Sequence, residues 1–368
     1  AQIPGDVVRV ADDVEVRRIS TLLESVGRAD GQPIRLAENS GIAFQGCIVL
    51  GMGFVLDETE AQEWIATDPR NAEVLFSYLN GEDLNSRPDA SASRWVIDFN
   101  DRSEAEAAHY ALPYSRLVER VKAERQRVKS DGSFVLRRPL PERWWQYGEK
   151  RPAMRKAIAP LAEVLVIARV SKTVMPMRVP TGQIPSEACV VFATDSYGDQ
   201  AVLSSNVHQV WAITYGSGLR NDPRYTPSDV FETFPRPRQV DQLETIGRIL
   251  DNERRAIMLR RNLGLTKLYN LVNDRRIPHE DDDDIARIRD IHAELDAKVL
   301  NAYGWSDIAL SHGFHAYRKM ERWTFNPAAR TETMDRLLQE NRLRATCGQR
   351  DRYLEVSENV REGEGTLF

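Results

Sequence analysis

The chain has 368 residues, 42% of them hydrophobic, and its 50 Lys and Arg face 55 Asp and Glu, a net charge of -5. This length is enough to bury more than one hydrophobic core and favours two domains. Cys47, Cys189 and Cys347 are too far apart for a CxxC redox motif or a cysteine zinc site, so we expect a reducing, cytoplasmic setting. The sequence has neither a signal peptide nor an apolar run of about 18 residues, which argues against export and membrane insertion.

Charge is distributed unevenly along the chain. Residues 1–110 hold 9 Lys and Arg against 20 Asp and Glu, whereas residues 111–185 hold 16 against 6, a net charge of +10. A basic block in an acidic chain is typical of a protein that turns one face toward a polyanion. A solvated helical surface would give the same pattern, so charge alone leaves both interpretations open.

The first predicted elements alternate between strand and helix. Residues 44–56 are β-rich and glycine-punctuated, and residues 58–66 have the acidic first turn of a helix. Residues 94–99 predict a short strand. Residues 103–128 have helical periodicity, with Pro113 either breaking that helix or opening a second one.

Four apolar, β-branched runs follow, at residues 163–172, 174–180, 187–194 and 200–205. They predict consecutive strands of a mostly antiparallel sheet. The proline-rich segment 234–240 then marks the clearest boundary in the chain.

The tail has a different periodicity. Residues 243–262, 284–304 and 329–345 repeat apolar positions at helical spacing, so we expect an all-α tail. The acidic run at 280–284 favours a helix start over a metal site, because negative charge stabilises a helix N-terminus. The chain is therefore predicted to be α+β, with a mixed, mostly antiparallel sheet and flanking helices before an all-α C-terminal domain.

Motifs for catalysis are missing from the sequence. It has no Asn-Pro-Pro-aromatic or Asp-Pro-Pro-aromatic motif, phosphate loop, GxSxG elbow or HExxH pair, and its six histidines are scattered. The glycines of residues 46–53 do not match the GxGxxG spacing of a dinucleotide loop. We expect no catalytic centre and no metal in this chain.

Residues with the right chemistry for DNA do occur in the basic block. Arginines and lysines of residues 137–156 are interleaved with Trp144, Trp145 and Tyr147, which are either stacking surfaces or core anchors. Residues 169–183, on or between predicted strands, combine Arg, Lys, Ser, Thr and Gln. Arginine reads guanine through two hydrogen bonds, and Asn or Gln reads adenine. A sheet edge with these side chains therefore has the hydrogen-bonding groups needed to read bases in the major groove.

Several long stretches resemble one family. The stretches are residues 74–99, 143–152, 164–183, 201–217 and 224–237, with further similarity in the tail at 264–274, 295–305 and 312–325. They are similar to the long single-chain type II restriction-modification enzymes, which join nuclease, adenine-specific DNA methyltransferase and target recognition in one polypeptide. The resemblance covers most of the chain from about Ser40. One departure is Arg236, where the family usually has an aromatic residue between two prolines.

The resemblance implies that this chain reads double-stranded DNA and that the catalytic domain precedes Ala1. The S-adenosylmethionine site would lie in that other domain, and no cofactor is expected here. Residues 1–39 would be a linker and the tail of the methyltransferase domain, 40–237 the target recognition domain and 238–368 a helical C-terminal domain. The residues that the resemblance offers for DNA contact are Asn80, Asn85, Arg87, Arg151, Arg169, Ser171, Lys172, Asn206 and His208.

Two other functions stay open at this point. The chain could be a specificity or scaffold subunit that docks a separate methyltransferase or nuclease chain and binds DNA weakly. It could also be an independent enzyme, which would need clustered carboxylates or histidines that the sequence does not offer. For the candidate contacts, the alternative is a structural hydrogen bond, as in the Asn-Gly turn at residue 80.

Overall fold

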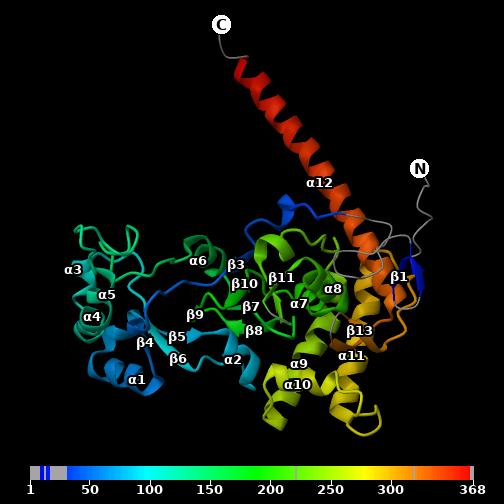
Figure 1. The fold of residues 1–368 in the computed structure, drawn as a ribbon, viewed down its shortest axis with the longest axis horizontal. Coiled ribbons are helices and arrows are strands. Elements are labelled where there is room, and N and C mark those ends of the chain that lie inside the picture. The colour runs from blue at the N-terminus through cyan, green and yellow to red at the C-terminus, as the bar shows by residue number, and fades with distance from the viewer. Residues whose placement is uncertain (1–8, 12–13, 17–30, 220–221, 318–319, 365–368) are drawn as a thin grey trace, which may run out of the picture.

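The computed structural model describes residues 9–11, 14–16, 31–219, 222–317 and 320–364, and it contains two four-stranded sheets (Figure 1). The first sheet has the order β4 (Val55–Leu56), β6 (Arg94–Ile97), β5 (Leu75–Leu79), β9 (Ile184–Pro185), and the second has the order β3 (Ala43–Gln45), β10 (Cys189–Phe192), β7 (Glu163–Ala168), β8 (Met177–Pro180). Every pairing within them is antiparallel except β5 with β9. The predicted α+β class with a mostly antiparallel sheet is confirmed.

Helices surround both sheets and dominate the C-terminal part of the chain. They are α1 (Glu58–Thr67), α2 (Gly81–Ser86), α3 (Glu104–Ala107), α4 (Ala111–Leu117), α5 (Ala123–Arg125), α6 (Pro152–Ile158), α7 (Tyr197–Ser204), α8 (Asn206–Tyr215), α9 (Glu244–Arg261), α10 (Leu265–Val272), α11 (Asp283–Ala302) and α12 (Pro327–Glu364). Three hairpins complete the fold, β1 (Arg9–Ala11) with β2 (Val14–Val16), β11 (Ser217–Leu219) with β12 (Asp222–Arg224), and β13 (Gly313–Tyr317) with β14 (Met320–Thr324). The C-terminal end of α12 extends away from the rest of the molecule (Figure 1).

Strand β7 shows how the sequence builds two cores at once. Val164, Val166 and Ala168 point into a first core, while Leu165 and Ile167 point into a second core on the opposite face of the sheet. Successive side chains of a strand point to opposite faces, so a strand covered on both sides is apolar at every position. The continuous run EVLVIA is therefore the expected sequence of this strand.

The predicted strand at residues 200–205 is wrong, because this run belongs to helix α7. The Ser196 side chain accepts a hydrogen bond from the backbone of Asp199 and caps the helix. The residues from Gly198 to Ser204 are buried on every side apart from Asp199. A helix buried all round has no polar stripe, so its periodicity cannot be told from that of a buried strand.

Other predicted elements match. Helix α1 covers the predicted helix at 58–66, and β6 forms the first four residues of the strand predicted at 94–99. Pro113 lies in the first turn of α4, where a missing backbone N–H costs little, so it opens a second helix. The acidic run at 280–284 leads into α11, and the Asp282 side chain caps this helix by accepting a hydrogen bond from the N–H of Ile285.

The tail is helical but not wholly so, because strands β13 and β14 interrupt it. Phe314 and Trp323 face each other across this hairpin, with ring centroids 5.3 Å apart. Arg289 of α11 lies over both rings, 4.9 Å from Phe314 and 5.3 Å from Trp323. Aromatic cross-strand pairs stabilise a hairpin, which accounts for the departure from the expected all-α tail.

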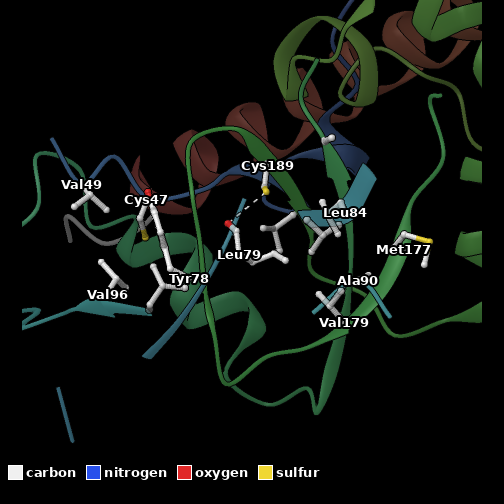
Figure 2. Packing of buried hydrophobic residues seen from close by; sticks show 14 of the residues in the cluster. Cys47, Val49, Tyr78, Leu79, Leu84, Ala90, Val96, Met177, Val179 and Cys189 are labelled. Atoms are coloured by element: carbon white, nitrogen blue, oxygen red, sulfur yellow. Dashed lines mark hydrogen bonds between the residues drawn. The ribbon is translucent and has the colours of Figure 1, made fainter. Parts of the chain in front are cut away.

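Both cores contain residues from before and after position 237. The first takes side chains from both sheets, among them Leu79 and Val179 (Figure 2). It also includes Met258 and Leu268 of the tail. In the second core, side chains of the second sheet, α7 and α8 pack with side chains of the tail. The tail residues are Leu243, Ile246, Leu250, Ile291, Leu295, Val299, Leu300, Phe325, Ala329, Leu337 and Leu338. The tail is thus part of the scaffold that holds the sheets.

The two buried cysteines of the first core, Cys47 and Cys189, are free thiols. Burial raises the pKa of Cys189 to about 12, and its Sγ lies 3.7 Å from the carbonyl oxygen of Leu79 (Figure 2). Burial also raises the pKa of Cys47. The free cysteines of the described residues, these two and the exposed Cys347, form no disulfide.

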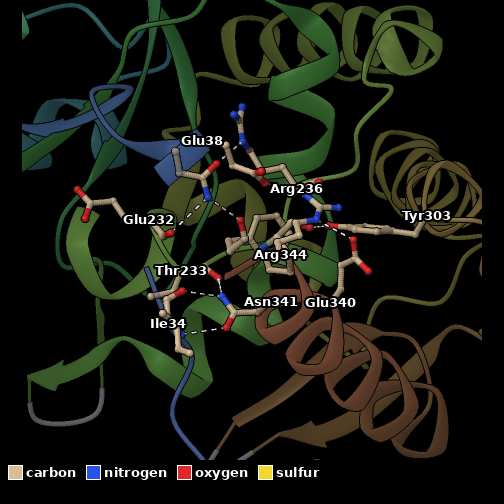
Figure 3. A network of polar contacts seen from close by, with 12 residues as sticks. Ile34, Glu38, Glu232, Thr233, Arg236, Tyr303, Glu340, Asn341 and Arg344 are labelled. Carbon is tan, nitrogen blue, oxygen red and sulfur yellow. Dashed lines mark hydrogen bonds and ion pairs between the residues drawn. The ribbon is translucent and has the colours of Figure 1, made fainter. Parts of the chain in front are cut away.

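A polar network joins the segment around residue 236 to α12 (Figure 3). Asn341 Nδ2 donates to the carbonyl oxygens of Ile34 and Thr233, at 2.7 and 2.6 Å. Arg344 Nη1 donates to the carbonyl oxygen of Arg236 at 2.7 Å and pairs with Glu38. The proline-rich segment predicted to be a boundary is therefore tied to the C-terminal helix.

Candidate nucleic-acid interface

Much of the basic block holds the fold together. Four of its arginines are largely or fully enclosed and bind protein groups. Arg116 pairs with Glu60, and Arg155 pairs with Asp98 at 2.8 Å. Arg178 donates to the carbonyl oxygen of Asp195 at 2.9 Å, and Arg125 donates to four carbonyl oxygens. These charges are directed inward. The interpretation of the whole block as one polyanion-facing surface is therefore wrong for them.

The aromatic residues of the block are also internal. Trp144, Trp145 and Tyr147 are 1%, 9% and 6% exposed and belong to the first core. The Trp145 indole donates to the carbonyl oxygen of Arg102 at 2.9 Å. Of the two roles open for these residues, the core-anchor role agrees with their burial.

An exposed edge forms where β7 ends. The backbone N–H of Arg169 donates to the carbonyl oxygen of Ala188 at 2.7 Å, and its carbonyl oxygen accepts from the N–H of Tyr225 at 2.7 Å. Val170 bridges Arg224, the last residue of β12, in the antiparallel direction. The chain after β7 is thus held between the turn that precedes β10 and the β11–β12 hairpin.

Three arginines gather at this edge, Arg151, Arg169 and Arg224, which we call the arginine cluster. Burial lowers the pKa of Arg169, and the positive charges of Arg224 and Arg151 lower it further, while Glu187 opposes the shift. The Nε of Arg169 is buried with no hydrogen-bond partner, and no ion pair of Arg169 or Arg224 is present among the described residues. Like charges held together are destabilising until an anion neutralises them.

Arg151 reaches the cluster from an unusual backbone position. It stands before α6 in the left-handed conformation, with φ of 56°. Its Nε donates to the carbonyl oxygen of Gly46 at 3.2 Å, and Nη1 lies 3.9 Å from Glu149. A side chain at Gly46 would collide with the carbonyl oxygens of Pro185 and Ser186, so that glycine permits a close packing of backbone segments.

The candidates on α2 divide into structural and surface residues. Asn80 caps the helix, accepting hydrogen bonds from the backbone of Glu82 and Asp83. Asn85 Oδ1 accepts from the Ser171 hydroxyl at 3.1 Å, which joins α2 to the edge after β7. Arg87 is exposed. Its Nε donates to the hydroxyl of Ser91 at 2.9 Å and lies 3.7 Å from a carboxylate oxygen of Asp89.

The remaining candidates separate in the same way. Lys172 is exposed beside the buried Ser171 at the edge. Asn206 is 4% exposed, and its backbone and side-chain amides both donate to Asp296 of α11, at 2.7 and 2.8 Å. His208 is fully buried. The structure therefore brings Asn85, Arg151, Arg169, Ser171 and Lys172 together and places Asn206 and His208 in the interior.

His208 gives a pH-dependent stability that can be tested. Its Nδ1 lies 2.9 Å from the carbonyl oxygen of Leu203 and its Nε2 3.0 Å from the hydroxyl of Tyr225, and burial lowers its pKa to about 4. The unfolded chain binds the proton at higher pH than the folded chain. As far as this group is concerned, the free energy of unfolding has its full value above about pH 6.5 and decreases as the pH falls toward 4. We expect urea unfolding of the His208→Gln variant to show a shallower loss of stability between pH 7 and pH 5; an unchanged slope would contradict this.

Sequence reasoning missed Arg224, which joins the cluster from a hairpin distant in the chain. It lies at the start of the 224–237 stretch, but nothing in its local sequence indicates proximity to Arg169. No group of three or more His, Cys, Asp or Glu side chains suited to a metal ion occurs among the described residues. Within the same part of the chain, no helix is long and apolar enough to cross a membrane.

Comparison with known proteins gives a family and a fold. A family model described as "MmeI, target recognition domain" matches residues 38–238. A solved structure, the type IIL restriction-modification enzyme MmeI in complex with DNA, matches with a TM-score of 0.60 and 16% sequence identity. The match covers 90% of this chain but 39% of that enzyme chain. No curated protein matches this chain.

Proposed function

Because this chain belongs to the MmeI target recognition domain family, we propose that it recognises a specific sequence in double-stranded DNA as part of a restriction-modification system. The reaction that this recognition serves is proposed to be S-adenosylmethionine-dependent methylation of adenine. A methyltransferase domain of the same parent chain would perform it, because this chain corresponds to 39% of the matched enzyme. The partners are then duplex DNA and that domain.

The observation that carries the proposal is the arginine cluster. Arg151, Arg169 and Arg224 come from three separate segments and meet at an exposed edge, where Glu187 acts on Arg169 and Glu149 lies 3.9 Å from Arg151. A planar guanidinium forms paired hydrogen bonds with a phosphate or with the O6 and N7 atoms of guanine. Asn85, Ser171 and Lys172 add hydrogen-bonding groups beside it.

The glycine-rich segment of residues 46–53 does not fit a cofactor loop. Gly46 lies against backbone carbonyls of residues 185 and 186, and a side chain at Gly53 would collide with Val121 and Arg120. A loop that binds a nucleotide-like cofactor needs free backbone N–H groups, but these two glycines are used for packing. This supports placing S-adenosylmethionine in the other domain.

The proposal is tested by selecting bound duplexes from a random library and measuring their affinity by fluorescence anisotropy at several salt concentrations. We expect one short motif to be enriched and bound at least ~10³-fold more tightly than random duplex, with affinity falling as salt rises. Weak, salt-sensitive binding without an enriched motif would overturn autonomous recognition. It would favour a scaffold role in which the chain docks a separate methyltransferase or nuclease.

A further inference from the structure

We infer that the loop of residues 126–138, here called the basic loop, is a second DNA contact that binds duplex phosphates regardless of base sequence. The inference rests on the proposed function and adds a surface remote in sequence from the edge after β7. Four of the loop's exposed residues are basic: Arg127, Lys129, Arg137 and Arg138.

The loop is a built structure held by its own hydrogen bonds. The N–H of Lys129 donates to the carbonyl oxygen of Ser133 at 2.7 Å, and that of Val135 donates to the carbonyl oxygen of Arg127 at 2.8 Å. Gly132 turns the chain with φ of 80°, a conformation that other residues rarely adopt. The two arms therefore form a short antiparallel ribbon.

The base of the loop is anchored in the first core. Arg125 Nη2 donates to the carbonyl oxygens of Val49 and Leu50, both at 2.7 Å, and its Nη1 donates to those of Trp144 and Gln146. Gln126 Nε2 adds a hydrogen bond to the carbonyl oxygen of Pro141 at 3.1 Å. A contact surface that is already ordered loses little conformational entropy when it binds.

The charges of the loop are mostly uncompensated. Arg138 pairs with Glu142 at 2.7 Å, and Asp131 is used within the turn, where it accepts from the backbone and hydroxyl of Ser133. Across the described residues, Arg127, Lys129 and Arg137 form no ion pair. Unpaired cations on an exposed ribbon are the chemistry that phosphate groups of a duplex neutralise.

The composition of the loop favours phosphate contact over the reading of adenine. It has no Asn, and its one Gln, Gln126, is engaged at the base, so it lacks the amide groups that read adenine. The side chains of its exposed apolar residues, Val128 at 56% and Val135 at 37%, have no hydrogen-bonding groups. Contacts of this kind set affinity and orientation, whereas base contacts set specificity.

The test compares two triple variants of equal charge. The loop variant is Arg127→Gln, Lys129→Gln, Arg137→Gln, and the tail control is Lys267→Gln, Arg276→Gln, Lys298→Gln, whose residues are all exposed. Anisotropy of the selected duplex and a scrambled duplex is measured from low to high salt. For the loop variant we expect a salt slope shallower by about 2 to 3, because each phosphate contact contributes about 0.9. The ratio of the two affinities should change by less than about twofold.

Each result has one meaning. A loop variant with the slope of the tail control overturns the inference, as does a loop variant that loses its preference for the selected duplex. If the unmodified chain binds duplexes without sequence preference, the proposed function fails while the slope comparison still tests the loop. Trypsin cleavage of the unmodified chain at these three residues provides a second measurement, and we expect either duplex to slow it; cleavage unaffected by DNA counts against the loop.

Discussion

Replacing Arg169 with alanine is expected to weaken binding of the selected duplex by about 10- to 100-fold, the value of one or two charged hydrogen bonds. Its guanidinium is partly enclosed, has an Nε without a partner and lies close to two other arginines. Anisotropy at constant salt measures the loss. The Lys172→Ala variant should also bind less well, and Lys267→Ala in the tail should bind like the unmodified chain.

The same substitution should leave stability unchanged or slightly higher. Nearby positive charges and burial both disfavour the charged form of Arg169, so removing it relieves repulsion in the free protein. A thermal unfolding midpoint that stays level or rises while affinity falls would separate a binding role from a structural one. Equal affinities of the Arg169→Ala, Lys172→Ala and Lys267→Ala variants would contradict the location of the site.

Replacing Arg125 with alanine should lower the free energy of unfolding by about 3 to 5 kcal/mol. Arg125 is 2% exposed, and its guanidinium donates to four backbone carbonyl oxygens, which would lose their partners in the variant. Burial lowers the pKa of Arg125 to about 10, so it stays charged at neutral pH. Urea unfolding at neutral pH measures the change.

The control for this prediction is Arg127→Ala, two positions along the chain. Arg127 is exposed and its side chain has no partner among the described residues, so its loss should change stability by less than about 0.5 kcal/mol. If both variants unfold alike, Arg125 is not the anchor of the basic loop.

The fold was predictable where one periodicity dominates. Strand β7 and helix α11 have the residue patterns of a two-sided strand and an amphipathic helix, and both form as expected. Helix α7 was misread because packing covers it on all sides and removes the polar stripe that identifies a helix. The β13–β14 hairpin was missed because the aromatic contacts that hold it involve Arg289 of another element.

The site was predictable in part, through family resemblance. Arg151 and Arg169 lie in stretches shared with the family, but the approach of Arg224 depends on a hairpin that only the fold positions. The net charge of residues 111–185 overestimates the positive charge at the surface, because Arg125, Arg155 and Arg178 bind groups of the interior. Composition cannot distinguish an arginine that binds carbonyls from one that faces solvent.

The sharing of both cores across position 237 bears on how such proteins could acquire new specificities. A chimera joined at that position would pair sheet faces and helix faces that were never packed together, so both cores would be mismatched. Recombination should preserve the sheets and tail helices as one inherited unit. Variation in what the protein reads is then expected to accumulate as point changes among side chains at the edge, which can be exchanged without repacking the interior.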